Sequence, residues 1–277
     1  MMRHVTGELA ASHAAPLFYQ SWRPEDEPRA VLILIHGFGE HGGRYNYLVD
    51  YLVPRGVAVY ALDLYGHGCS PGKRGGLSEW EQYVQDADAL VNLVKREEPN
   101  LPRFIMGHSM GGLIVASYLL DHQAGLNGAV LSAPLLEEAN VSPLIKTAMK
   151  LLNRVTPGLS LSTSLDAGAI SREPAEVLRY QQDSLNHDKA SVRLGNEMLR
   201  MAPEVHRRAG KIVLPLLIYH GEGDQLVPIS GSRRLADEVG STDCTFVAYP
   251  GGYHELHNDL DRATVLADLY EWLERHL

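Results

Sequence analysis

Residues 103–120 read RFIMGHSMGGLIVASYLL, an apolar run that leads into a serine between glycines and then into a second apolar run. A Gly-x-Ser-x-Gly sequence between a strand and a helix is typical of a nucleophile elbow, where small residues let the strand and the helix approach each other. Such a turn exposes the serine hydroxyl and places the next amide at a helix N-terminus, whose positive dipole favours an oxyanion. We therefore predict that Ser109 is a nucleophile; the alternative is a structural serine in a turn.

Similar apolar runs lie on both sides of this stretch, and each ends in glycine or a polar turn. They are rich in β-branched residues, as buried parallel strands are, and occupy residues 30–39, 57–68, 128–134, 214–224 and 244–255. Segments of helical periodicity lie at residues 44–56, 78–100, 111–125, 230–240 and 262–277. In the second of these, Ser78 is the expected N-cap and Pro99 the expected stop. This alternation predicts an α/β fold whose parallel sheet is covered by helices on both faces.

The alternation breaks once, between the strands that end near Pro134 and begin near Val213. The interval contains helix-like segments but no convincing central strand, so we interpret residues 135–210 as a helical cap inserted into a core formed by residues 1–134 and 211–277. Residues 140–211 hold eleven Lys/Arg and seven Asp/Glu (+4), and the rest of the chain holds 14 and 27 (−13). This basic insertion is either scatter in surface charge or a surface for anionic head groups and fatty-acid carboxylates.

Composition excludes several classes of protein. A formal net charge of −9 argues against nucleic acid as a partner, and 45% hydrophobic residues argue for an ordinary globular chain. The two cysteines, Cys69 and Cys244, have no metal-like spacing and fit a reduced cytosolic protein. The N-terminal stretch has polar residues where a signal peptide would be apolar, and no apolar run is long enough to span a membrane. We expect a soluble, cytoplasmic protein.

A nucleophilic serine needs a base and an acid. The last strand-like run is followed by YPGGYHELHND, in which His254 lies just after the glycines and is the expected base; His257 is the alternative. The preceding run ends in HGEGDQLVP, where Asp224 is the expected acid and Glu222 its competitor. Asp224 could also simply cap the following helix. The order Ser, Asp, His is the one expected for a G-x-S-x-G enzyme of this class.

An oxyanion hole needs two backbone N–H groups directed at one oxygen. The amide of Met110, directly after the nucleophile, is one candidate. The glycine-rich sequence HGFGEHGGRY, which follows an early strand, offers the amide of Phe38 as the second. The alternative is that this segment is only a turn.

Seven sequence blocks together resemble one family. HGFGEHGGRY, DLYGHGCSPG, GHSMGG, SAPLL, HGEGDQLVP, YPGGYHELHND and the cap block ISREPAEVLRYQQDSL are similar, in order and spacing, to blocks of the monoacylglycerol lipase and lysophospholipase group of α/β-hydrolases (serine aminopeptidase S33-like). The resemblance covers nearly the whole chain. It implies an α/β-hydrolase fold with a mostly parallel eight-stranded sheet, one antiparallel strand near the N-terminus and a helical cap after the sixth strand. It also implies the roles assigned above to Ser109, Asp224, His254, Phe38 and Met110.

The chain departs from the family pattern at two positions. Ser184 stands where relatives have a proline after the aspartate of the cap block, and Phe38 is bulky where some relatives carry a small residue. The first departure concerns the local geometry of the cap, and the second the width of the site near the acyl carbonyl.

The resemblance implies an enzyme that cleaves monoacylglycerol to glycerol and free fatty acid through an acyl-enzyme, with no metal and no organic cofactor. The alternatives are a lysophospholipase, a short- or medium-chain carboxylesterase, a cofactor-free perhydrolase and, more remotely, a non-catalytic ligand-binding relative. A small cap suits one acyl chain and a small alcohol better than three chains. Tyr180, in the cap block, is a candidate partner for glycerol hydroxyls, with surface packing as the alternative.

The cap sequence SPLIKTAMKLLNRVTP predicts a helix with one broad apolar face. We expect part of this face, with Leu144, Met149 and Leu152, to line the acyl entrance and to make transient contact with a lipid surface, so that the protein is peripheral to membranes. Ordinary packing of this face onto the core is the alternative.

Overall fold

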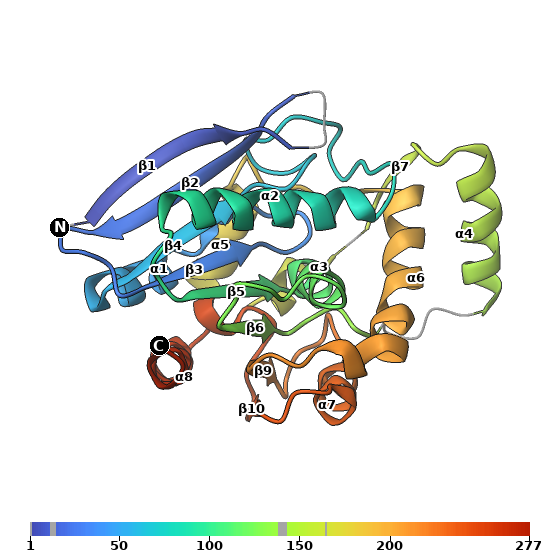
Figure 1. Cartoon of the computed structure of the whole chain (residues 1–277). Helices are drawn as coiled ribbons and strands as arrows, with labels where there is room; N and C mark the ends of the chain where they lie inside the picture. The colour runs from blue at the N-terminus through green and yellow to red at the C-terminus, as the bar shows by residue number, and fades with distance from the viewer. Residues whose placement is uncertain (1, 12–14, 138–142, 164) are drawn as a thin grey trace.

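The computed structural model describes residues 2–11, 15–137, 143–163 and 165–277 (Figure 1). An eight-stranded sheet forms its centre, in the spatial order β1 (Met2–Leu9), β2 (Leu17–Pro24), β4 (Val57–Leu62), β3 (Ala30–Ile35), β5 (Arg103–His108), β6 (Gly128–Ser132), β9 (Leu216–Gly221) and β10 (Cys244–Tyr249). β2 is antiparallel to both of its neighbours, and the strands from β4 to β10 pair in parallel. The prediction of a mostly parallel sheet with one antiparallel strand near the N-terminus is therefore confirmed.

The central strands β4, β3, β5, β6 and β9 are buried on both faces, which explains their continuous apolar runs. In β3, Val31, Ile33 and Ile35 belong to one hydrophobic core, and Leu32 and Leu34 belong to the other. The first core contains α2 (Glu81–Glu97), α3 (Met110–Leu119) and α7 (Ile229–Glu238), and the second contains α1 (Asn46–Leu52) and α8 (Arg262–Arg275). Short 3₁₀ turns complete the body at η1 (Gly42–Arg44), η2 (Val53–Arg55), η4 (Ala209–Lys211) and η5 (Leu256–Asn258).

The cap follows β6, as expected. It consists of α4 (Pro143–Val155), β7 (Ser160–Ser162), η3 (Ala167–Ala169), α5 (Pro174–Gln182), β8 (Lys189–Ser191) and α6 (Val192–Arg208). The strands β7 and β8 form a separate antiparallel ribbon, outside the central sheet. In Figure 1, α6 stands between α4 and the body, and its contacts with α3 join it to the first core.

The helix α4 packs on α6 and leaves much of its apolar surface open to solvent. Leu144 is 80% exposed, Val155 73% and Leu151 63%. The exposed apolar side chains of α4 therefore do not form a face packed onto the core, which was the alternative expectation. Among the described helices, none is both long enough and apolar enough to cross a bilayer.

Candidate active site

The elbow after β5 holds Ser109 in an unusual backbone conformation, with φ 53° and ψ −118°. A Cβ added at Gly107 would lie 2.2 Å from the carbonyl oxygen of Gly111, and one added at Gly111 would lie 2.2 Å from that of Ile35. No side chain fits in either place, so these glycines allow β5, α3 and β3 to meet closely behind the serine. The strained turn then places Ser109 at the carboxyl edge of the sheet.

Asp224 and His254 meet at the same edge, from the loops after β9 and β10. The Nδ1–H of His254 donates to Oδ2 of Asp224 at 2.7 Å, and Oδ1 accepts from the amides of Leu226 (2.8 Å) and Val227 (3.0 Å). His220, which the sequence analysis did not single out, donates from Nε2 to Oδ2 at 3.0 Å. The carboxylate is thus oriented by four donors, and Nε2 of His254 is left to accept a proton.

The electrostatics favour an ionised acid beside a basic imidazole. Burial alone would raise the pKa of Asp224, but the charge of His254 and the hydrogen bonds from His220 and His254 hold this pKa well below its usual value. Burial alone would lower the pKa of His254, but the charge of Asp224 and the hydrogen bond to it outweigh burial and raise this pKa above the ordinary 6.5. The pair is therefore suited to take up and stabilise a proton.

The competing residues lie elsewhere. His257 is fully buried, stacks on Tyr45 with ring centroids 4.6 Å apart, and has no hydrogen-bond partner for either ring nitrogen among the described residues. Burial lowers the pKa of His257 to about 3, so it remains neutral. Glu222 is partly exposed at the surface and pairs with Arg233 at 3.2 Å. Within the described part of the chain, neither forms a hydrogen bond with Asp224 or His254.

Ser109 and His254 line one narrow pocket, with about 30 Å³ of space for water-sized molecules. Its walls come from both the body and the cap, and consist of Gly37, Phe38, Glu40, His108, Ser109, Leu165, Ile170, Tyr180, Leu226, His254 and Glu255. The pocket thus brings together Ser109, His254, Phe38 and Tyr180 from the predicted site. Leu144, Met149 and Leu152 are not among its lining residues; they lie on α4, where a Cβ added at Gly195 of α6 would come within 2.8 Å of the end of Met149.

Residues 37–41, which we call the oxyanion loop after its predicted role, lie beside Ser109. A Cβ added at Gly37 would lie 3.2 Å from Cβ of Ser109. Within the described part of the chain, the amides of Phe38 and Met110 have no hydrogen-bond acceptor. Two free N–H groups next to a nucleophile are what an oxyanion hole requires.

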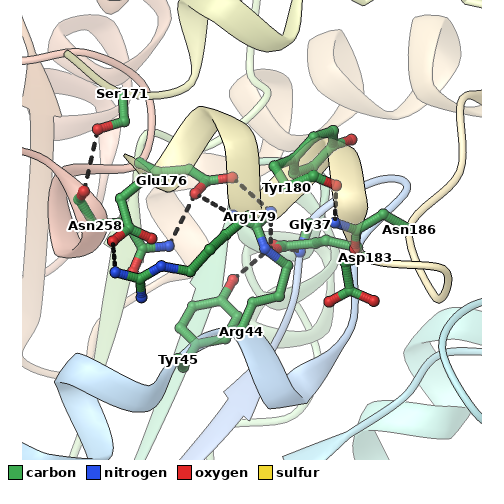
Figure 2. A network of polar contacts seen from close by, with 12 residues as sticks. Gly37, Arg44, Tyr45, Ser171, Glu176, Arg179, Tyr180, Asp183, Asn186 and Asn258 are labelled. Atoms are coloured by element: carbon green, nitrogen blue, oxygen red, sulfur yellow. Dashed lines mark hydrogen bonds and ion pairs between the residues drawn. The ribbon is translucent and has the colours of Figure 1, made fainter. Parts of the chain in front are cut away.

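A buried network of charged side chains lies at the wall of the pocket, and the sequence analysis did not predict it (Figure 2). Arg44 donates to both carboxylate oxygens of Glu255, at 3.0 and 2.7 Å, lies 3.6 Å from Glu40, and stacks over the ring of Tyr180 at 4.5 Å. Glu40 accepts from the amide of Gly37 at 2.6 Å. The block HGFGEHGGRY contains Glu40 and Arg44, but nothing local indicates that Arg44 pairs with a residue 211 positions away.

Arg44 sets the charge states in this network. Burial would raise the pKa of Glu255, but the Arg44 guanidinium outweighs burial and lowers it. Glu40 shares the same cation less closely, so burial raises its pKa. Burial also raises the pKa of Tyr180 to about 12, so its phenol stays a neutral hydrogen-bond donor.

His108, the residue before the nucleophile, also lines the pocket. Burial lowers its pKa well below the ordinary value, and Nδ1 lies 3.1 Å from Oγ of Ser132. Its ring centroid lies 4.7 Å from that of His254, so it packs against the imidazole of the predicted base. Among the described residues, no three His, Cys, Asp or Glu side chains form a group that could hold a metal ion.

Comparison with known proteins gives concordant results. The sequence profile of the family described as serine aminopeptidase, S33, matches residues 26–261. The chain is 38% identical to a monoacylglycerol lipase of Mycolicibacterium smegmatis over 94% of both chains, and 35% identical to the monoglyceride lipase of Rattus norvegicus over 94% of this chain and 88% of that protein. The crystal structure of Paleococcus ferrophilus monoacylglycerol lipase superimposes with a TM-score of 0.85 at 36% identity, covering 94% of this chain and 99% of the other. The chain therefore belongs to the serine aminopeptidase S33 family of α/β-hydrolases.

Proposed function

We propose that this protein is a serine carboxylic ester hydrolase that cleaves monoacylglycerol to glycerol and a free fatty acid. The observation that carries the proposal is the convergence of Ser109 and the Asp224–His254 pair on one pocket, beside two amides that have no acceptor among the described residues. The relatives named above, which are monoacylglycerol and monoglyceride lipases, supply the substrate class.

The reaction proceeds through an acyl-enzyme. Nε2 of His254 takes the proton of Ser109 as Oγ attacks the ester carbonyl, and the amides of Phe38 and Met110 bind the oxyanion that forms. The imidazolium, stabilised by Asp224, then gives its proton to the leaving glycerol oxygen. A water molecule repeats the sequence on the acyl-enzyme, with His254 again as base, and releases the fatty acid.

The walls of the pocket support glycerol as the leaving alcohol. Tyr180, Glu40 and Glu255 line it with polar groups, and the phenol of Tyr180 is neutral. A buried hydroxyl without a partner is costly, so a site with such groups favours a substrate that carries free hydroxyls. Tyr180 is therefore proposed as a partner for the glycerol moiety.

The acyl chain needs more space than this pocket provides. Ligand pockets usually enclose roughly 300–1,000 Å³, whereas the space beside Ser109 is about 30 Å³. We propose that the α4 part of the cap shifts to admit the chain, and that Leu144, Met149 and Leu152 then line its entrance. The exposed apolar side chains of α4 also suit transient contact with a lipid surface. The free thiols of Cys69 and Cys244 fit a cytoplasmic location.

A substrate panel tests the proposal. It compares kcat/KM for 1-lauroylglycerol, trilaurin and lauroyl lysophosphatidylcholine in matched dispersions, with Ser109→Ala as the inactive control. We expect 1-lauroylglycerol to be the preferred substrate. A tenfold or greater preference for the lysophospholipid would replace this proposal with a lysophospholipase, and the basic cap would then be a phosphate-binding surface.

A further inference from the structure

The oxyanion loop is held in place from two sides. On the body side, Nδ1–H of His36 donates to the carbonyl of Gly37 at 2.7 Å, while its Nε2 accepts from the amide of Leu64 at 3.0 Å. Glu40 accepts from the amide of Gly37. These contacts fix the beginning of the loop, but none of them reaches Phe38 or Gly39.

The second side comes from the cap. The amide of His187 donates to the carbonyl of Gly39 at 2.9 Å. Gly39 has φ +72°, and a Cβ there would lie 2.2 Å from the carbonyl oxygen of His187, so the two backbones are in direct contact. The ring of His187 also packs edge-on against Phe38, with centroids 5.7 Å apart.

A polar link completes this contact. Nδ1 of His41 accepts from the amide of Gly43 at 3.1 Å, so its proton is on Nε2, which donates to Oδ2 of Asp183 at 2.9 Å. The other oxygen, Oδ1, accepts from the amide of Leu185 at 2.9 Å and fixes the turn that leads to His187. The side chains of His41 and Asp183 are 10% and 30% exposed, so the link is partly shielded from water.

The same cap segment is tied to the rest of the network. Figure 2 shows Tyr180 and Asp183, at the end of α5, in the polar network around Arg44. Asn186 donates from Nδ2 to the carbonyl of Tyr180 at 2.9 Å, which ties the turn between Asp183 and His187 to the last turn of α5. The segment is therefore a compact unit rather than an open loop.

We infer that Asp183, acting through His41, and His187 are positioning residues for the oxyanion hole. They hold the oxyanion loop so that the amide of Phe38 is directed at the reacting oxygen. The cap thus has two roles: α4 covers the acyl entrance, and the segment from Asp183 to His187 completes the catalytic geometry. This inference rests on the proposed role of Phe38 in ester hydrolysis.

The substitution Asp183→Asn isolates the link. An asparagine keeps an oxygen for the amide of Leu185 but presents an NH₂ group to the Nε2–H of His41, so two donors face each other. Asp188→Asn is the matched control, because Asp188 directly follows the segment, is half exposed, and contacts Lys189 and Ser162 rather than the oxyanion loop.

Two ligands separate positioning of the amide from general damage. A hexyl trifluoromethyl ketone adds to Oγ of Ser109, passes the serine proton to His254 and forms an oxyanion, whereas 1-O-hexylglycerol binds without forming one. Removing an oxyanion donor altogether costs about 10²–10³ in kcat, so its displacement should cost about tenfold. We expect Asp183→Asn to lower kcat on p-nitrophenyl butyrate and weaken the ketone by about tenfold. For Asp183→Asn, KM and the Kd of the ether should stay within about twofold of the wild-type values. For Asp188→Asn, every measured value should stay within the same range.

A double-variant cycle provides the second measurement. His41→Ala removes the same link, so adding Asp183→Asn to it should lower kcat by less than about twofold more. A further tenfold loss, equal weakening of the ketone and the ether, or an Asp183→Asn enzyme that matches Asp188→Asn would each overturn the inference. If Asp183→Asn matches Asp188→Asn while the wild-type enzyme hydrolyses the ester, only the positioning inference fails and the proposed function stands. A wild-type protein without esterase activity would refute the proposed function itself.

Discussion

Ser109 and its neighbours show what local sequence can specify at the scale of single residues. The glycines around the serine permit a close approach of strand and helix, and Ser109, Asp224 and His254 follow β5, β9 and β10, whose carboxyl ends lie at one edge of the sheet. Such features are local, so the sequence can predict Ser109, Asp224 and His254 as candidates, and the structure brings Ser109 and His254 to one pocket and pairs His254 with Asp224. His220 and the Arg44–Glu255 pair could not, because their partners become neighbours only through the parallel sheet.

The base can be tested by alanine substitution. His254→Ala should lower kcat by roughly 10⁴- to 10⁶-fold, because the nucleophile loses its proton acceptor while the pocket and the amides remain. His257→Ala is the matched control, since His257 is buried nearby but has no contact with Asp224. Steady-state kinetics on p-nitrophenyl butyrate would measure both. Near-normal turnover by His254→Ala, with loss in His257→Ala, would assign the base to His257 instead.

The pH profile follows from the raised pKa of His254. The imidazole must be neutral to accept the serine proton, so kcat/KM should rise with pH through the pKa of His254 in the free enzyme. Because Asp224 raises that pKa, the midpoint should lie above the ordinary 6.5 of histidine. A flat profile between about pH 5 and 8 would be incompatible with a histidine base.

At the scale of secondary-structure elements, the strands β3, β4, β5, β6, β9 and β10 were predictable from apolar runs, whereas the more exposed β1, the strand β2 and the cap ribbon were not. Strands buried on both faces carry long apolar runs, which the sequence displays directly. The expected N-cap at Ser78 was wrong: α2 begins at Glu81, after Trp80, whose Nε1–H donates to Oγ of Ser117 at 3.1 Å. Docking of this tryptophan on α3 determines where the helix starts, and that contact is not visible in local sequence. The short β7–β8 ribbon was likewise too brief to show a strand pattern.

The helix α5 is anchored at its beginning as well as at its end. Oδ2 of Asp259 accepts from the amide of Tyr253 and from Nε of Arg172, both at 2.8 Å, and Oδ1 accepts from the amide of Arg172 at 2.8 Å. The amide of Glu255 donates to the carbonyl of Ile170 at 2.8 Å. These hydrogen bonds hold the cap against the loop that carries His254.

Asp259→Ala should be strongly destabilising, because Asp259 is fully buried and its loss removes the acceptor of Nε of Arg172 and of the amides of Arg172 and Tyr253. We expect a fall of about 3 kcal/mol in the free energy of unfolding. Asp261→Ala removes a half-exposed carboxylate from the same arginine and should cost less than about 1 kcal/mol. Urea denaturation would measure the free energy of unfolding of both variants. Equal losses would show that the buried hydrogen bonds of Asp259 add no stability beyond that of the exposed ion pair with Asp261.

At the scale of the whole molecule, the body and the cap differ in how tightly they are held. The carboxyl edge of the sheet, α5 and the segment from Asp183 to His187 form one hydrogen-bonded unit around the pocket. The helix α4 lies outside that unit against α6, with apolar side chains in solvent. Periodicity predicted its amphipathic character, but whether such a face packs on a core or faces solvent depends on tertiary contacts.

Because α4 lies outside the hydrogen-bonded unit, substitutions on its exposed face should affect activity on lipid substrates without damaging the catalytic geometry. Leu144→Asp combined with Leu152→Asp should impair hydrolysis of long-chain emulsified esters far more than that of soluble butyrate esters, because charges on the exposed face of α4, the proposed acyl entrance, would oppose contact with lipid. Val213→Asp is the control, an exposed apolar residue on the body that is 61% accessible. Rates on both substrates would be compared for the two variants. Equal loss on both substrates in the double variant would indicate packing damage rather than a role at the entrance.

The central claim, ester cleavage through an acyl-enzyme on Ser109, is tested most directly by mass spectrometry of the protein quenched during turnover of 1-lauroylglycerol. The account predicts a lauroyl ester on the peptide that contains Ser109, and neither the ester nor turnover in Ser109→Ala. Release of lauric acid by Ser109→Ala at a rate near that of the wild type, or a lauroyl group on another residue, would contradict it.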